Sequence, residues 1–178
     1  MTRAGRWEWA FAADAVARGD LLVLLEGGIA LSRPVAVGDH FWLLPSWRSE
    51  RPEAVKRTWW PELSRAHREQ PADGSVPLRT LCSVVSSHPL DAAARTRIAH
   101  QHPWSTAYAD RAERALLVRA HASAAASQVA LEQGDDRYTE LADDPPEDAL
   151  LPALTDEAFA LHRGRLERDL EAADAPHR

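Results

Sequence analysis

Aromatic and basic side chains alternate between Trp42 and Arg68, and this stretch has the chain's strongest potential for binding chemistry. Its tryptophans are Trp42, Trp47, Trp59 and Trp60, and its cations are Arg48, Arg51, Lys56, Arg57, Arg65 and Arg68. Indole faces stack on nucleobases while guanidinium groups meet phosphates, so the combination favours a nucleotide or single-stranded nucleic acid as ligand. In the alternative interpretation, Trp42 and one of Trp59 or Trp60 belong to the core. The arginines then form a solvated helix face balanced by Glu50, Glu53, Glu62 and Glu69.

A second group of candidate binding residues comprises His102, Trp104, Tyr108 and Arg111. Trp104 follows a proline in a predicted turn, where no strand or helix face requires a large aromatic side chain. Tyr108 and Arg111 are three residues apart on a predicted short helix, so they share one face. Together these groups would hold a flat ligand and its phosphate or carboxylate. Alternatively, Trp104 and Tyr108 cap the core, and Arg111 pairs with Asp110 or Glu113.

A metal site is the third candidate. His100 and His102 would lie on one side of an extended segment, and Asp110 or Asp91 could complete a site, although the spacing fixes no third ligand. Such a site would suit a metal-dependent enzyme acting on phosphate esters, with the histidines as ligands or as general acid and base. No other catalytic motif is specific, because Gly27-Gly28 lacks the further residues of a phosphate loop and no Gly-x-Ser-x-Gly is present. The sequence therefore predicts no cofactor and favours a binding protein over an enzyme.

Composition limits the class of protein. The chain has 178 residues, of which 45% are apolar and 27% charged, and this suits one compact domain or one domain with an appendage. No window of about eighteen apolar residues and no apolar signal core are present, so we expect a cytoplasmic protein that does not enter a membrane. Cys82 is the only cysteine, which excludes disulfides within the chain and thiolate zinc clusters. We expect it to be a buried structural thiol.

Charge is distributed unevenly along the chain. From Leu131 onward there are 14 acidic and 5 basic side chains, a net charge of −9, so residues 1–130 carry +3 of the total of −6. A mildly basic body is compatible with an anionic ligand, but a sequence pI of about 5.7 argues against a duplex binder. The acidic tail leaves a third class open, a structural protein that contacts a protein partner of unknown identity through this tail.

The first half of the chain is predicted to form two strands flanked by helices. A helix over residues 8–18 ends at Gly19, and apolar strands follow at residues 21–25 and 40–44, each next to a glycine turn. Pro52 can begin a helix that reaches about Trp60, where Pro61 forces a break before a short polar helix over residues 62–69. Residues 70–75 are predicted to be a surface loop.

The second half predicts two further strands and a closing helix. We expect strands over residues 76–86 and 116–129, helices over 90–100 and 106–113, and a linker over 132–153. A helix over 154–173 should begin at the N-cap Thr155, with Leu154 stapled to Phe159, and should bury Phe159, Leu166 and Leu170. The domain prediction is therefore an α+β domain at 1–131, an acidic proline-rich linker at 132–153 and a packed C-terminal helix at 154–173.

Five short motifs give the chain a family resemblance. They are Leu22-Val-Leu-Leu-Glu-Gly-Gly-Ile29, Phe41-Trp-Leu-Leu-Pro45, His102-Pro-Trp104 with Tyr108 and Arg111, Leu116-Leu-Val-Arg119, and Leu154-Thr-Asp-Glu-Ala-Phe159. In this order the chain resembles the bacterial family catalogued as domain of unknown function 1802 (DUF1802), which implies no particular activity. The family pattern has an Arg-Lys pair before Gly-Gly-Ile and a His-Gln pair after the proline, where this chain has Leu25-Glu26 and Ser49-Glu50. The resemblance adds Arg119 to the candidate binding residues.

The order of elements is also similar to that of small barrels of the PUA and ASCH type, many of which bind RNA or modified bases. We therefore predict an α+β fold with a small, mostly antiparallel curved sheet, flanking helices and a C-terminal helix. The predicted function is a binding module for a nucleotide or single-stranded nucleic acid. Its predicted ligand-binding residues are Trp47, Arg48, Arg51, Arg57, Trp59, His102, Trp104, Tyr108, Arg111 and Arg119.

Overall fold

The structure is a computed structural model that describes residues 4–27, 35–48, 51–129, 131, 137–142, 145, 147 and 150–171. Its strands are β1 (Ala4–Trp9), β2 (Val23–Glu26), β3 (His40–Ser46), β4 (Val76–Pro89), β5 (Arg114–Val129), β6 (Tyr138–Glu140) and β7 (Leu151–Pro152). Its α-helices are α1 (Ala10–Arg18), α2 (Trp60–Arg68), α3 (Ala92–Arg97), α4 (Thr106–Ala109) and α5 (Asp156–Glu171). Three 3₁₀ turns, η1 (Pro52–Ala54), η2 (Arg57–Trp59) and η3 (Ile98–Gln101), complete the described elements.

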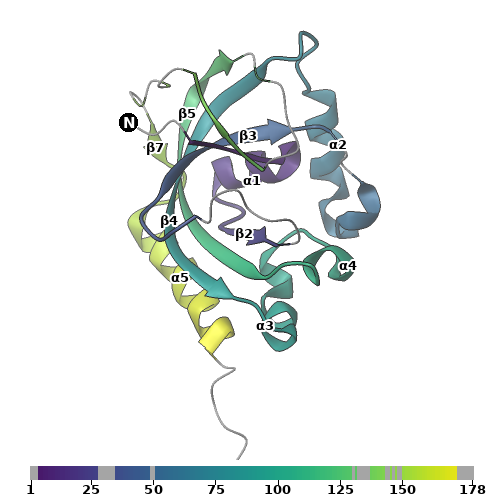
Figure 1. The fold of residues 1–178 in the computed structure, drawn as a ribbon, viewed down its shortest axis with the longest axis vertical. Coiled ribbons are helices and arrows are strands. Elements are labelled where there is room, and N and C mark those ends of the chain that lie inside the picture. Colours follow the sequence, from purple (N-terminus) through teal and green to yellow (C-terminus); the bar gives the residue numbers. More distant parts are fainter. Residues whose placement is uncertain are drawn as a thin grey trace, which may run out of the picture.

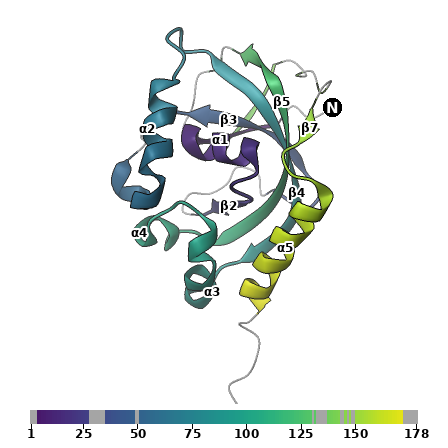
Figure 2. The ribbon, with the colours of Figure 1, turned by 180° about the vertical axis from the view of Figure 1, so that it is seen from behind.

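All the described strands belong to one curved sheet. Six follow the order β2-β5-β4-β3-β1-β6, and β7 pairs with β5. Every pairing is antiparallel except that of β1 with β3. The long strands β4 and β5 carry most of the curvature, α1 lies within the curve, and α5 runs along the outer side (Figures 1 and 2). The predicted α+β class with a mostly antiparallel curved sheet is therefore confirmed.

Both faces of the sheet carry buried apolar side chains. Successive side chains of a strand point to opposite faces, so one strand contributes to both clusters. The inner face carries residues such as Phe41, Leu43 and Val84, which pack with α1 in the main core. Trp42 and Leu44 alternate with them and form a second core with Trp7 on the outer face. This arrangement explains why β3 reads as a continuous apolar run rather than as an alternating one.

Several sequence predictions hold for individual elements. The strand predicted over 116–129 exists and is longer, and Cys82 is fully buried at the inner face. The C-terminal helix is also confirmed: the Thr155 hydroxyl accepts from the backbone N–H of Ala158 at 3.2 Å, while Phe159 and Leu166 are buried against the body. Gly19 ends α1 in the left-handed conformation, as a C-terminal glycine commonly does.

Other predictions were wrong. Residues 4–9 form the strand β1, whereas the sequence predicted only a helix from residue 8. The helix predicted from Pro52 to Trp60 is replaced by η1 and η2, and α2 starts at Trp60 with Pro61 in its first turn. The helix predicted over 106–113 ends at Ala109. Parts of the range predicted as a linker are strands, because β6 pairs with β1 and β7 with β5. No helix among the described residues is long and apolar enough to cross a membrane.

Candidate ligand-binding site

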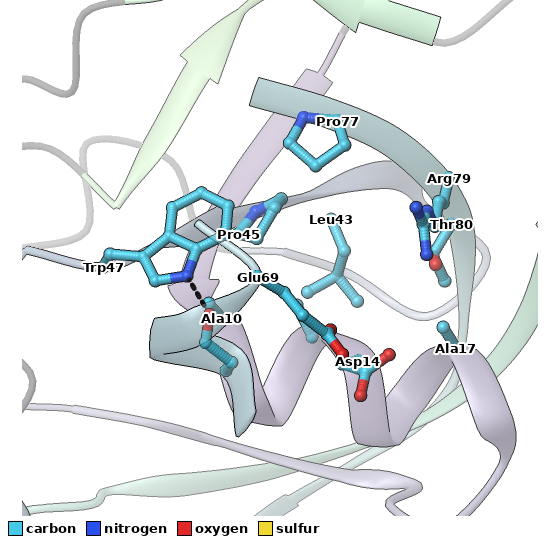
Figure 3. A pocket seen from close by; sticks show the side chains of 12 residues that line it. Ala10, Asp14, Ala17, Leu43, Pro45, Trp47, Glu69, Pro77, Arg79 and Thr80 are labelled. Atoms are coloured by element: carbon cyan, nitrogen blue, oxygen red, sulfur yellow. Dashed lines mark hydrogen bonds between the residues drawn. The ribbon is translucent and has the colours of Figure 1, made fainter. Parts of the chain in front are cut away.

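Trp47 lies at the junction of two pockets. It follows the last residue of β3, and its indole Nε1 donates a hydrogen bond of 2.9 Å to the backbone carbonyl of Ala66 in α2 (Figure 3). This bond fixes the half-buried ring between the end of the strand and the last turns of the helix. Trp47 and Pro45 line both pockets, so one indole borders two adjoining hollows.

The first pocket lies between α1, α2 and the strands β3 and β4 (Figure 3). Its volume is about 100 Å³, enough for a small group or a few waters. Leu43 points into it, while Asp14, Glu69 and Arg79 supply its charges. Asp14 is already engaged, since its carboxylate pairs with Arg65 at 2.6 Å. The pocket is therefore largely apolar with partly compensated charge.

The second pocket is larger, at about 350 Å³, within the range that small-molecule sites occupy. Its lining is Trp7, Pro45, Ser46, Trp47, Arg48, Gln70, Pro71, Gly74, Ser75, Val76 and Leu131. Arg48 is exposed and is the only charged residue among the described residues of this lining. The buried indole nitrogen of Trp7 has no hydrogen-bond partner in the described part of the chain. Two indoles, a few polar groups and one guanidinium suit a flat ligand that carries a negative charge.

The other predicted residues of the tryptophan–arginine stretch precede α2 in the chain. Arg51 and Arg57 are exposed, and the Arg57 guanidinium lies 5.8 Å from the ring centroid of Trp60, which is 42% exposed. Trp59 is half-buried with its ring 6.3 Å from that of Phe11. The stretch is thus divided between the two ends of α2, a helix of nine residues and therefore about 13 Å long.

Trp104 and Tyr108 belong to an aromatic cluster. Trp104 is only 2% exposed, and its ring lies 4.9 Å from Trp9, 5.5 Å from Phe11 and 4.8 Å from Tyr108. The alternative interpretation, in which Trp104 and Tyr108 pack in the core, therefore describes the structure. A ligand cannot stack on Trp104, because its ring is buried in this cluster.

His102 is buried next to this cluster. Its Nδ1 accepts a hydrogen bond of 3.2 Å from the backbone N–H of Trp104, while its Nε2 has no partner among the residues that the structure describes. Burial, with further contributions from the charges of Lys56 and His100, lowers the pKa of His102 to about 4. His100 is instead exposed, and its Nε2 lies 3.4 Å from the carboxylate of Asp169 in α5. The described residues contain no group of three acidic, histidine or cysteine side chains arranged for a metal ion.

Arg111 and Arg119 lie on different elements. Arg111 is exposed in the turn after α4. Arg119 lies in β5, where it pairs with Asp156 and covers the ring of Phe159 at 5.3 Å from the centroid. Arg119 therefore contacts α5, and the predicted residues do not converge on one pocket.

The chain is similar to a known protein family and to a solved structure. The model of the family described as "Domain of unknown function (DUF1802)" matches residues 7–164. The chain belongs to the DUF1802 family. No curated protein matches it. A crystal structure of a mutant ASCH protein from Zymomonas mobilis is similar over 78% of this chain and 88% of that chain, with 14% sequence identity and a TM-score of 0.44.

This DUF1802 protein also contains a buried charged cluster that sequence reasoning missed. Arg6 of β1 and Glu26 of β2 form an ion pair of 3.4 Å, and Glu8 approaches the same guanidinium at 3.3 Å. All three residues are at most 2% exposed. Tyr138 donates to Glu26, and Arg137 donates to the Leu25 carbonyl at 2.8 Å. We name Arg6, Glu8, Glu26, Arg137 and Tyr138 the seam cluster.

Two sequence signals could have revealed the seam cluster. Residues 6–9 alternate between charged and aromatic, which is the period of a strand, and Glu26 is a charge at the end of an apolar run. The departures Ser49 and Glu50, like Gly28, lie outside the described residues. Gly27 is described, and a Cβ there would lie 2.6 Å from the backbone nitrogen of Glu113.

Proposed function

We propose that this DUF1802 protein is a binding module for a nucleotide or single-stranded nucleic acid, and that the ligand lies across Trp47. The observation that carries the proposal is the position of Trp47, held by Ala66 and bordering both pockets beside the exposed Arg48. An indole held in place by a hydrogen bond loses little freedom when a base stacks on it. Such stacking contributes about 1–3 kcal/mol per base.

The larger pocket supplies the elements that a nucleotide requires. A base would lie beside Trp47, where Gln70 offers hydrogen bonds to its edge and the Ser75 hydroxyl, which donates to Asp73 at 2.7 Å, can still accept one. The phosphate lies toward the exposed Arg48, whose guanidinium brings a positive charge to this side of the pocket. A longer strand would continue along α2 toward its first residue, the exposed Trp60, which lies beside Arg57.

The enzyme alternative receives less support from the same geometry. A metal-dependent phosphate-ester hydrolase would need His100 and His102 to face one ion. His102 is buried with its Nδ1 engaged, while His100 lies near Asp169 at the surface. These side chains would have to rearrange before they could share a ligand.

The test is a binding screen of nucleotides and short single-stranded RNA and DNA oligomers at low salt, where phosphate contacts are strongest. For the best ligand, Trp47→Ala should weaken binding roughly 5- to 150-fold, the equivalent of the stacking energy. Arg48→Ala should weaken binding. It should also reduce the slope of the logarithm of the binding constant against the logarithm of the salt concentration by about 1, the contribution of one phosphate contact.

Arg111→Ala is the matched control, because Arg111 is an exposed arginine outside both pockets. It should leave binding unchanged, and each variant should keep the melting temperature of a folded protein. If Arg111→Ala abolishes binding while Arg48→Ala does not, the ligand lies at the α4 turn and the Trp47 site is wrong. If the wild-type protein binds nothing in the screen, the nucleic-acid function itself is wrong.

A further inference from the structure

Trp60 is the only aromatic side chain that is exposed in the described part of the chain, at 42%. Its indole Nε1 donates a hydrogen bond of 3.3 Å to the Val55 carbonyl, and the Arg57 guanidinium lies 5.8 Å from its ring centroid. Trp47 is held in the same way, because its Nε1 donates to the Ala66 carbonyl. Two indoles with fixed orientations therefore lie near opposite ends of α2.

A row of exposed side chains leads from Trp60 toward the larger pocket. Trp60, Ser64 and Arg68 follow one another at intervals of four residues, a spacing that places them on one face of α2. All three are exposed. Gln70, two residues beyond Arg68, lines the larger pocket. We name Trp60, Ser64 and Arg68 the α2 row.

The acidic side chains at this helix belong to its other side. At about 3.6 residues per turn, Glu62 and Glu69 are about half a turn away from Trp60. Their side faces α1, because Arg65 pairs with Asp14 of α1 at 2.6 Å, and Glu69 lines the first pocket together with Asp14 (Figure 3). The α2 row therefore contains a cation and an aromatic ring but no carboxylate that would repel a phosphate.

The separation of the two indoles fits a strand of several nucleotides. Trp47 is bonded at Ala66, six residues after Trp60, so at about 1.5 Å per residue the two positions are about 9 Å apart along the helix axis. Stacked nucleotides follow one another at about 3.4 Å along a strand, so this distance corresponds to about three steps. A single base stacked on Trp47 would leave Trp60 without a ligand.

We propose that the ligand is a single-stranded nucleic acid of about four nucleotides or more, rather than a free nucleotide, and that the α2 row binds its second part. The inference rests on the proposed function, in which the first base stacks on Trp47. A base further along the strand stacks on Trp60, and Arg68 binds a phosphate between them. Every base has a flat face, so the row selects ligands by length rather than by sequence.

The test is a length series of oligothymidylates and oligouridylates, from one to six nucleotides, titrated by calorimetry at low salt. With the wild-type protein, the tetranucleotide of the preferred series should bind at least about tenfold more tightly than the mononucleotide, because a second base is stacked. This gain exceeds what the alternative registers of a short homopolymer supply. Lengthening from four to six nucleotides should add little, because the row ends at Trp60.

Variants separate the two indoles. Trp60→Ala should remove the gain from one to four nucleotides and leave mononucleotide binding unchanged, whereas Trp60→Phe keeps a ring and should retain most of the gain. Trp47→Ala should weaken binding at every length. Arg68→Ala should lower the salt slope by about 1 for the tetranucleotide only. Arg165→Ala, which removes an exposed arginine of α5, is the matched control and should change neither ligand.

The failure of this inference differs from the failure of the proposed function. Equal affinity for one and four nucleotides, or a gain that survives Trp60→Ala, overturns the α2 row and leaves the Trp47 site standing. Equal weakening at every length by Trp60→Ala also overturns the row, because Trp60 would then contact the first base. If no length binds to the wild-type protein, both proposals fail. If Trp60→Ala does not fold, the wild-type length series and Arg68→Ala, at an exposed position, still decide.

Discussion

Acidification should destabilise this protein through one histidine. His102 is 2% exposed, and its Nδ1 accepts from the Trp104 backbone N–H at 3.2 Å. The proton of the neutral ring therefore lies on Nε2, and a second proton would have to displace this hydrogen bond. Burial and the nearby charges of Lys56 and His100 oppose that proton and lower the pKa of His102 to about 4.

The sign and size of the effect follow from linkage. In the unfolded chain the pKa of a histidine is about 6.5, so between about pH 6.5 and pH 4 the unfolded state binds more protons than the folded state. The free energy of unfolding therefore falls as the pH decreases through this window. At about 1.36 kcal/mol per pKa unit, the loss attributable to His102 reaches about 3 kcal/mol.

The assay is urea unfolding followed by tryptophan fluorescence, for the wild-type protein and His102→Gln, between about pH 7 and pH 4. Carboxylates titrate in the lower part of this range in both proteins, so their contribution cancels in the difference. The wild-type protein should lose about 3 kcal/mol more than the variant. Parallel curves for the two proteins would refute a buried, neutral His102.

Three further predictions concern packing. In chemical unfolding, Gly27→Ala should lower the free energy of unfolding by at least about 2 kcal/mol, because a Cβ would lie 2.6 Å from a backbone nitrogen. Gly164→Ala, at an uncrowded position in α5, should instead raise it by about 0.5–1 kcal/mol. Thr155→Ala should lower the free energy of unfolding by about 1 kcal/mol, because it removes the α5 cap. Leu166→Ala should lower it by about 2–5 kcal/mol, because Leu166 is fully buried. An unchanged melting temperature for both variants would contradict the docking of α5. Burial raises the pKa of the Cys82 thiol, so a thiol reagent should modify it only after unfolding, and rapid modification of the native protein would show that the inner face is accessible.

Local patterns predicted most of the elements. Glycine stops, apolar runs and the Thr155 cap are short-range signals, and the strands β2 to β5 and helix α5 appear where those signals lie. The strand β1 was missed because Trp9, Ala12, Ala13 and Val16 share a helical period, and this pattern hid the alternation that precedes Ala10. The short strand β6 lies in a charged, proline-rich range, and it forms only because β1 offers an unpaired edge.

The candidate site was predicted less well, because it depends on contacts between distant segments. Composition identified Trp47 and Arg48, but it grouped them with Trp104, which is buried next to Trp9 and Phe11 from the start of the chain. Exposure cannot be read from residue type, since a tryptophan serves equally as core and as a stacking surface. The pairing of Arg6 with Glu26 could not be predicted either, because it joins two strands, β1 and β2, that are far apart in the strand order of the sheet.

The position of the seam cluster bears on why a buried ion pair is present at all. A buried pair such as Arg6 and Glu26 commonly contributes no net stability, because desolvation offsets the attraction between the charges. Apolar side chains could have filled the same space within the core that surrounds Phe41. Apolar contacts could not have satisfied the Leu25 carbonyl, however, which accepts from Arg6 and Arg137 at an edge where no described strand pairs with β2. The guanidinium groups of Arg6 and Arg137 thus have a structural role at the seam, because they satisfy a backbone carbonyl at the edge of the described sheet.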